Sequence, residues 1–148
     1  MLRHIDPAIS AELLYVLMLM GHGDDIVLCD INHPAATIAK QTTHGKLIDL
    51  PGCDIPRAAR AVLSLMPLDT FVDHPVMRMR VVGDPNGTVP IFAAMQTTLD
   101  ACEKRKIAIG AHDRFDFYDA AKKSFAIVRT SDSGPYGCFI LRKGVLTV

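Results

Sequence analysis

The sequence predicts an α/β fold, in which helices cover both faces of one largely parallel, mixed sheet to give a three-layer α/β/α domain. Strand-like and helix-like segments alternate along the whole chain, and the strand-like segments are too apolar to face water on both sides. The 148 residues, 49% of them hydrophobic, are enough to build one substantial core. Because no repeat, low-complexity tract or linker divides the chain, we expect a single domain over residues 1–148.

Capping residues and apolar spacing predict the helices. Ser10, Asp54 and Asp113 each stand where a side chain can cap a helix that follows. Two further helices begin with a proline in the first turn, where the missing N–H costs nothing. The expected helices cover residues 11–20, 34–41, 56–66, 90–104 and 114–123.

Short apolar runs bounded by turn residues predict the strands. One of them alternates Met77 and Met79 with Arg78 and Arg80, which is typical of a half-exposed strand. The expected strands cover residues 26–30, 46–50, 76–82, 106–110, 125–129 and 136–141.

Charge and cysteine content exclude several classes of protein. Sixteen basic and sixteen acidic residues cancel, so no overall field favours a nucleic acid or an anionic membrane as partner. The apolar block at residues 13–20 is too short to span a bilayer and is followed by no signal cleavage site. Four cysteines form no Cys-x-x-Cys pair and sit in or beside apolar segments. We therefore expect a cytoplasmic protein without disulfides.

The spacing of the histidines does not favour a metal site. Zinc ligands usually occur in close pairs, and His22 has no recognised spacing to His33 or Cys29. The glycines around His22 also match neither nucleotide-binding loop pattern. We expect neither a metal nor a nucleotide.

The segment at residues 20–25, Met-Gly-His-Gly-Asp-Asp, is the most informative in the chain. It puts His22 and Asp30 at the two ends of one strand-like run, and an imidazole exchanges protons near neutrality because its ordinary pKa is about 6.5. Gly21 can take the left-handed conformation that ends a helix, and Gly23 leaves the histidine free of bulky neighbours. This context suggests chemistry, although a histidine just past a helix also serves as a charge partner of the helix dipole.

Other polar residues are expected beyond the carboxyl ends of strands, where open α/β sheets usually bind ligands. Asp30 follows one strand, and Arg114 opens a helix that follows another. Tyr136 begins the last expected strand, after a loop at residues 131–135. Spacing alone does not establish that these residues meet. Asp30 can instead cap a turn, Arg114 can pair with a surface carboxylate, and Tyr136 can be an amphipathic strand residue.

The order and separation of several motifs resemble the sugar mutarotase family that contains L-fucose mutarotase and D-ribose pyranase. The match extends nearly from end to end, and its aromatic helix and Tyr-Gly pair are similar to the fucose branch. The motifs are Gly21-His22-Gly23-Asp24, Asp30, Pro34, Arg114-Phe115-x-Phe117-Tyr118, Phe125-Ala126-Ile127-Val128, Tyr136-Gly137 and Lys143-Gly144-Val145.

The resemblance implies a cofactor-free isomerase that interconverts the α and β anomers of a free monosaccharide, most simply L-fucose. The reaction opens a hemiacetal, which requires a proton at the ring oxygen and removal of another from the anomeric hydroxyl. By the family pattern His22 is the proton donor to the ring oxygen, and Arg114 is the sugar-binding arginine. Asp30 holds sugar hydroxyls or helps to orient the site. Tyr136 is either a proton relay or a hydrogen-bonding residue, and a phenol pKa near 10 favours the hydrogen-bonding role at least as much as the relay.

One position departs from the family pattern. Tyr136 and Gly137 match the start of a three-residue binding segment, but Cys138 stands where the fucose branch carries asparagine. A thiol is a weak partner for a hydroxyl, so the exact sugar is open, although a backbone contact at Cys138 survives the change. Asp69 is a weaker candidate, because a loop aspartate is more often a turn former.

The resemblance also implies a homo-oligomer, because members of the family assemble into rings, commonly decamers, with sites near subunit contacts. Two alternatives to the fucose mutarotase remain at this point. One is an enzyme of the D-ribose pyranase type, which exchanges pyranose and furanose rings. The other is a sugar-binding accessory protein without turnover.

Overall fold

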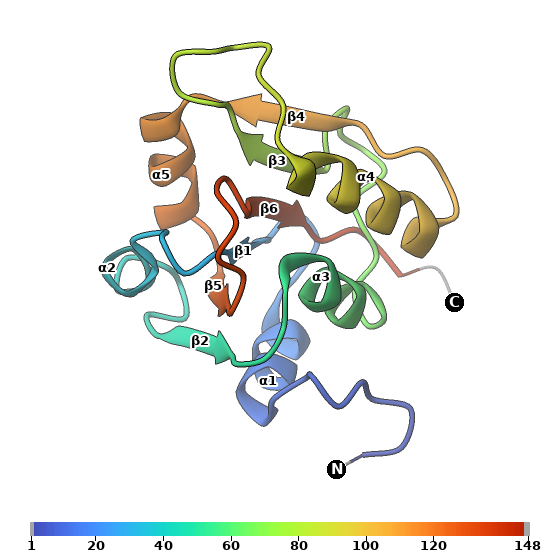
Figure 1. Cartoon of the computed structure of the whole chain (residues 1–148). Helices are drawn as coiled ribbons and strands as arrows, with labels where there is room; N and C mark the ends of the chain where they lie inside the picture. Colours follow the sequence, from blue (N-terminus) through green and yellow to red (C-terminus); the bar gives the residue numbers. More distant parts are fainter. Residues whose placement is uncertain (1, 147–148) are drawn as a thin grey trace.

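The computed structural model describes residues 2–146 and contains the alternating elements that the sequence predicts (Figure 1). Its helices are α1 (Ala11–Leu19), α2 (Ala35–Ala39), α3 (Ile55–Leu63), α4 (Pro90–Glu103) and α5 (Arg114–Lys122). Its strands are β1 (Asp25–Cys29), β2 (Leu47–Leu50), β3 (Val76–Met79), β4 (Ile109–His112), β5 (Ala126–Thr130) and β6 (Cys138–Arg142). No helix within residues 2–146 has both the length and the apolarity to cross a bilayer.

The strands form one mixed sheet in the order β2-β5-β1-β6-β3-β4. The pairs β1–β5, β2–β5 and β3–β4 are parallel, whereas β6 is antiparallel to both of its neighbours, β1 and β3. All strands of this sheet except β6 therefore point the same way, as the predicted largely parallel sheet requires. Their carboxyl ends and the start of β6 lie along one edge of the sheet, which we call the carboxyl edge. The opposite edge is the amino edge.

The helices cover both faces of the sheet, which confirms the predicted three layers. Figure 1 shows α2 and α5 together on one side, while α1, α3 and α4 lie on the other. Alternation along β1 explains how one strand serves both cores: Ile26 and Leu28 face the α1, α3 and α4 side, and Val27 and Cys29 face the α2 and α5 side. All four cysteines are free thiols.

Two of the three expected helix caps are confirmed. The Ser10 hydroxyl accepts a hydrogen bond from the N–H of Leu13 at 3.1 Å, and Asp54 accepts one from the N–H of Arg57 at 2.7 Å. The prediction for Asp113 is wrong in its mechanism. Asp113 occupies the N-cap position of α5, but its carboxylate bonds to the Arg80 guanidinium at 3.0 Å instead of to the helix.

The fourth and sixth strands begin later than predicted. Residue 106 was expected to open β4, but the N–H of Ile107 donates to the Asp100 carboxylate at 2.8 Å, so this stretch closes the end of α4 instead. Tyr136 was expected to open β6, yet it lies in a turn with φ 62°, and the N–H of Cys138 donates to its carbonyl at 2.8 Å. Both shifts arise from local turns that compete with strand pairing.

The left-handed residue after α1 is Gly23, with φ 86°, and not Gly21 as the sequence suggested. Met20 ends the helix in an extended conformation. The N–H of Gly23 then donates to the carbonyl of Lys143 at 2.9 Å, so the sharp turn falls where the chain joins the sheet.

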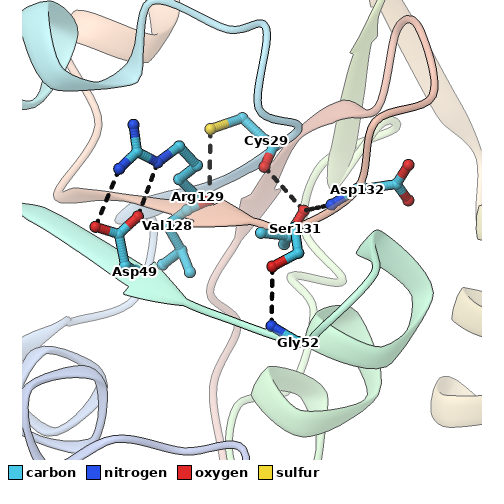
Figure 2. Close-up of polar contacts among 8 residues, drawn as sticks. Cys29, Asp49, Gly52, Val128, Arg129, Ser131 and Asp132 are labelled. Carbon is cyan, nitrogen blue, oxygen red and sulfur yellow. Dashed lines mark hydrogen bonds and ion pairs between the residues drawn. The ribbon is translucent and has the colours of Figure 1, made fainter.

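Polar contacts fix the loop that leaves β5 at the carboxyl edge (Figure 2). The Thr130 hydroxyl donates to the carbonyl of Cys29 at 3.1 Å and accepts from the N–H of Asp132 at 3.2 Å. The N–H of Gly52 donates to the Ser131 hydroxyl at 2.8 Å. The bond to Cys29 ties the loop to the end of β1, next to Asp30, and the bond from Gly52 ties it to the turn after β2.

Candidate functional site

A pocket of about 360 Å³ opens at the carboxyl edge. Its walls come from the loop after β1, the end of β3, the first half of α5 and the loop that leads into β6. This is the position that the strand directions predict for a ligand site. The lining residues are Asp30, Asn32, His33, Met79, Val82, Arg114, Tyr118, Pro135, Tyr136 and Cys138.

Asp30 is buried in the pocket wall, with 4% of the residue exposed. Its Oδ1 accepts hydrogen bonds from the N–H groups of Asn32 at 2.8 Å and His33 at 3.1 Å. Burial raises the pKa of this carboxyl group above its usual value; bonds from these N–H groups and from that of Gly137 oppose the rise, and the nearby Asp132 carboxylate adds to it. Asp30 therefore caps a turn and also presents a poorly solvated carboxylate to the pocket.

Gly137 allows the chain to pass close to Asp30. A Cβ atom at this position would lie 3.2 Å from Asp30 Cβ and 3.3 Å from Ile55 Cγ1. Both contacts are tighter than ordinary van der Waals packing, so a side chain here would displace the Asp30 carboxylate or the helix below it.

Tyr136 takes a left-handed backbone conformation, which is rare for a bulky residue. Its phenol oxygen accepts a hydrogen bond from the N–H of Val82 at 3.0 Å, which links the β6 loop to the loop after β3. Because the oxygen acts as acceptor in this bond, its own proton is free for a ligand in the pocket. The interpretation of Tyr136 as an amphipathic strand residue is thus wrong.

Arg114 carries the positive charge of the pocket. Its Nε donates to the Tyr118 hydroxyl at 3.2 Å, and its guanidinium carbon lies 5.6 Å from the ring centres of both Phe115 and Tyr118. The hydrogen bond to Tyr118 raises the pKa of Arg114, which keeps the guanidinium charged. This bond replaces the surface ion pair considered from the sequence. Sequence reasoning missed Tyr118 as a site residue, although its position four residues after Arg114 puts both on one helix face.

Cys138 lies at the base of the pocket as a neutral thiol. The residue is 3% exposed, and burial, with a smaller contribution from the Asp30 carboxylate, raises its pKa to about 12. It pairs in register with Cys29 across β1 and β6. A thiol that stays protonated in this way is neither a nucleophile nor a strong hydrogen-bonding group.

His22 lies at the amino edge, in the turn between α1 and β1. Its side chain is 47% exposed, and Nε2 is 3.2 Å from Oδ1 of Asp69. The five residues of β1 separate it from Asp30 by about 17 Å at roughly 3.3 Å per residue. Within one chain, therefore, the structure brings Asp30, Arg114, Tyr136, Gly137 and Cys138 together but leaves His22 apart from them.

Asp69 and Phe71 hold the imidazole of His22. The Asp69 side chain is 3% exposed and accepts the N–H of Phe71 at 3.0 Å, which makes it the turn former that the sequence suggested. Burial works against its ionisation, but the bonds from Phe71 and His22, with the charge of Arg142, hold the pKa of Asp69 below its usual value. When neutral His22 donates through Nε2 to this carboxylate, its lone pair lies on Nδ1. No spacing rule in the sequence linked residues 22 and 69.

Comparison with known proteins connects this geometry to a family. The family model described as the RbsD / FucU transport protein family matches residues 3–146. The chain belongs to this family. The resemblance inferred from its motifs is thereby confirmed.

Individual relatives of the family differ in their similarity to the chain. The fucose mutarotase of Homo sapiens is 40% identical over 153 residues, which cover 99% of this chain and 96% of the human protein. The crystal structure of the Streptococcus pneumoniae fucose mutarotase in complex with L-fucose has a TM-score of 0.87 and 39% identity, with 99% of this chain and all of that chain covered. Bacillus subtilis RbsD complexed with D-ribose has a TM-score of 0.73 over 99% of this chain and all of that chain; at 22% identity it shares the fold alone.

Proposed function

We propose that this protein is an aldose mutarotase, an isomerase that interconverts the α and β anomers of L-fucose. The observation that carries the proposal is the pocket at the carboxyl edge, where a carboxylate, a guanidinium and a phenol converge in a chain of this family. Relatives that align with nearly the whole chain are named fucose mutarotases. The ribose-binding relative is far less similar, which disfavours the pyranase alternative.

The chemistry needs two proton transfers and no net change in protons. One proton goes to the ring oxygen while another leaves the anomeric hydroxyl, and both transfers reverse after the free carbonyl has turned its other face. Asp30 accepts hydrogen bonds from sugar hydroxyls, and Arg114 donates hydrogen bonds to them. Together these bonds orient the hemiacetal. The hydroxyl hydrogen of Tyr136 is available to a sugar oxygen, because the phenol oxygen is the acceptor in its bond with Val82. His22 is the proposed proton donor, because an imidazole can carry both an N–H and a lone pair.

His22 can reach a bound sugar only if it comes from a second copy of the chain. It stands at the amino edge beside Phe71, which is 74% exposed. At the carboxyl edge Phe115, which is 73% exposed, follows the pocket residue Arg114 and lines an adjoining cavity. An amino edge that docks on a carboxyl edge makes a head-to-tail contact, and such contacts form a ring when the rotation between successive copies closes on itself. We therefore propose a homo-oligomeric ring, with the decamer common in the family as the expected size.

A cytoplasmic location also belongs to this proposal. Three of the four thiols, Cys29, Cys53 and Cys138, are buried and free, which suits a reducing compartment. The substrate is a free monosaccharide, and we propose no nucleic acid or membrane partner and no cofactor. Because Cys138 offers the pocket only a weak hydrogen-bonding group, a sugar other than L-fucose should also be tested. D-ribose comes first, since the alternative activity is that of a D-ribose pyranase.

Exchange NMR on equilibrated L-fucose tests the activity directly. With the protein present we expect faster exchange between the α and β anomer signals, and the variant His22→Ala should return the rate to that of the sugar alone. The variant His44→Ala is the control, because it removes an imidazole that pairs with Glu12 instead of with Asp69. Equal exchange rates with and without the protein, for L-fucose and D-ribose alike, would refute the proposal.

The separation of His22 from the pocket favours one other candidate, a sugar-binding accessory protein. If the chain acts as single copies, the pocket binds a sugar but lacks the proton donor. Binding of L-fucose without any acceleration of anomer exchange would support this second function.

A further inference from the structure

A buried imidazole in the wall of the pocket has no role in the function proposed above. His33 lines the pocket, and only 8% of the residue is exposed. Within residues 2–146, its Nε2 is the one buried side-chain nitrogen or oxygen without a hydrogen-bond partner. Because buried polar atoms in folded proteins nearly always have a partner, this nitrogen points to a ligand atom.

The neighbours of His33 are the residues that define the sugar pocket. Its backbone N–H donates to Asp30 Oδ1 at 3.1 Å. Its ring packs edge-on against Tyr118, with ring centres 5.3 Å apart, and against Phe117 at 5.7 Å. Tyr118 in turn accepts the hydrogen bond from Arg114. His33 therefore contacts Asp30 through its backbone, and its ring contacts Tyr118, the hydrogen-bond partner of Arg114.

The protonation state of His33 suits a hydroxyl group. Burial lowers its pKa to about 4, so the ring is neutral near pH 7 and carries one N–H donor and one lone pair. A hydroxyl can donate to the lone pair or accept from the N–H. Asp30 can only accept and Arg114 can only donate, and the Cys138 thiol does neither well. His33 thus adds a group that can either donate or accept, which Asp30, Arg114 and Cys138 do not supply.

We propose that His33 determines sugar specificity, because its imidazole hydrogen-bonds one hydroxyl of the bound monosaccharide. This inference rests on the proposed function and adds a substrate contact to it. Since Nε2 is shielded from solvent in the structure, the contact forms when the sugar displaces the Tyr118 ring or the imidazole turns about its Cβ–Cγ bond.

The test combines the variant His33→Phe with sugars that each lack one hydroxyl. Phenylalanine keeps an aromatic ring against Phe117 and Tyr118 but removes both nitrogens. We titrate wild type and variant with L-fucose and with its 2-, 3- and 4-deoxy analogues. We expect the variant to bind L-fucose about five- to tenfold more weakly, the size of one hydrogen bond. Wild type should lose a similar factor with one analogue, and the variant should show no further loss with that same analogue.

A purely structural role would give a different pattern. The control Phe117→Leu disturbs the same packing at a residue that does not itself line the pocket, and it should change the affinity for all four sugars by one common factor. The imidazole ¹⁵N signals of His33 should also shift when L-fucose is added. The inference is overturned if His33→Phe weakens all four sugars equally, or leaves every affinity unchanged while wild type still accelerates anomer exchange. A wild type that binds none of these sugars would remove the proposed function as well.

Discussion

Tyr136 shows how this chain departs from local preference to build its pocket. A bulky residue at φ 62° is unfavourable by roughly 1 kcal/mol or more, yet here it directs a phenol to the loop after β3. Asp30 behaves similarly, because its burial keeps a carboxylate where ionisation is disfavoured. Strain and poor solvation at single residues are expected where the surrounding structure holds them for a ligand.

The burial of His33 predicts a pH dependence of stability. Its pKa is about 4 in the folded chain and near 6.5 when unfolded, so between these values the unfolded chain binds more protons. The contribution of His33 to stability is therefore present above pH 6.5 and is lost as the pH falls towards 4. Relative to His33→Phe, wild type should lose about 2 kcal/mol between pH 7 and pH 5. Urea unfolding at both pH values and one protein concentration measures this. An equal loss of unfolding free energy in wild type and in His33→Phe would contradict this prediction.

The sequence was sufficient for the pocket residues that follow strands and insufficient for contacts between distant loops. Asp30 and Arg114 were found because a strand end or a helix start fixes where a side chain lies. The sequence suggested His33 only as a metal ligand to be rejected, because its burial is not visible in spacing. It suggested Asp69 as a turn former, because its pairing with His22 across 47 residues is equally invisible. The burial of His33 and the pairing of Asp69 both arise from tertiary packing.

At the scale of elements, caps and apolar spacing were reliable, and local turns were not. The helices at Ser10 and Asp54 begin where their caps predict, since a cap satisfies N–H groups within the same few residues. The start of β4 was misplaced because Asp100, seven residues upstream, binds the backbone of Ile107. The reversed direction of β6 was also not predictable from its composition, which resembles that of a parallel strand.

Ser10 and Asp113 both occupy N-cap positions, but only Ser10 bonds to its helix, so the effects of their substitution on stability should differ. Ser10→Ala removes a hydrogen bond to the backbone of α1 and should lower the free energy of unfolding by about 1 kcal/mol. Asp113→Ala removes only an exposed ion pair with Arg80, so the loss should be about 0.5 kcal/mol or less. Urea unfolding of both variants at equal protein concentration checks the ranking. An equal or larger loss for Asp113→Ala would mean that its carboxylate does cap α5 in solution.

At the scale of the whole molecule, strand direction decides what a single copy can do. Because every strand of the described sheet except β6 points to the carboxyl edge, a residue that precedes β1 and one that follows it lie at opposite edges. The sequence placed His22 and Asp30 at the two ends of one strand, but it could not show which surfaces of two copies meet. That residues 1–148 form one domain, and that the ring is a decamer, remain predictions.

Mixed oligomers test whether one site draws on two copies. His22→Ala damages only the amino edge, and Arg114→Ala damages only the pocket, so each variant alone should accelerate anomer exchange little. If the two are unfolded together, refolded at equal amounts and mixed at random, about a quarter of head-to-tail contacts join an intact histidine to an intact pocket. Exchange NMR on L-fucose should then recover about a quarter of the wild-type rate.

The control for this mixture pairs two variants that damage the same part of the site. Arg114→Ala mixed with Asp30→Asn leaves no intact pocket in any copy, so no contact can be complete and the rate should stay low. Recovery in this control would mean that refolding itself, and not shared sites, restores activity. Failure of the first mixture to recover, while size measurements show mixed oligomers, would place proton transfer within a single chain and exclude His22 of a second copy as the donor.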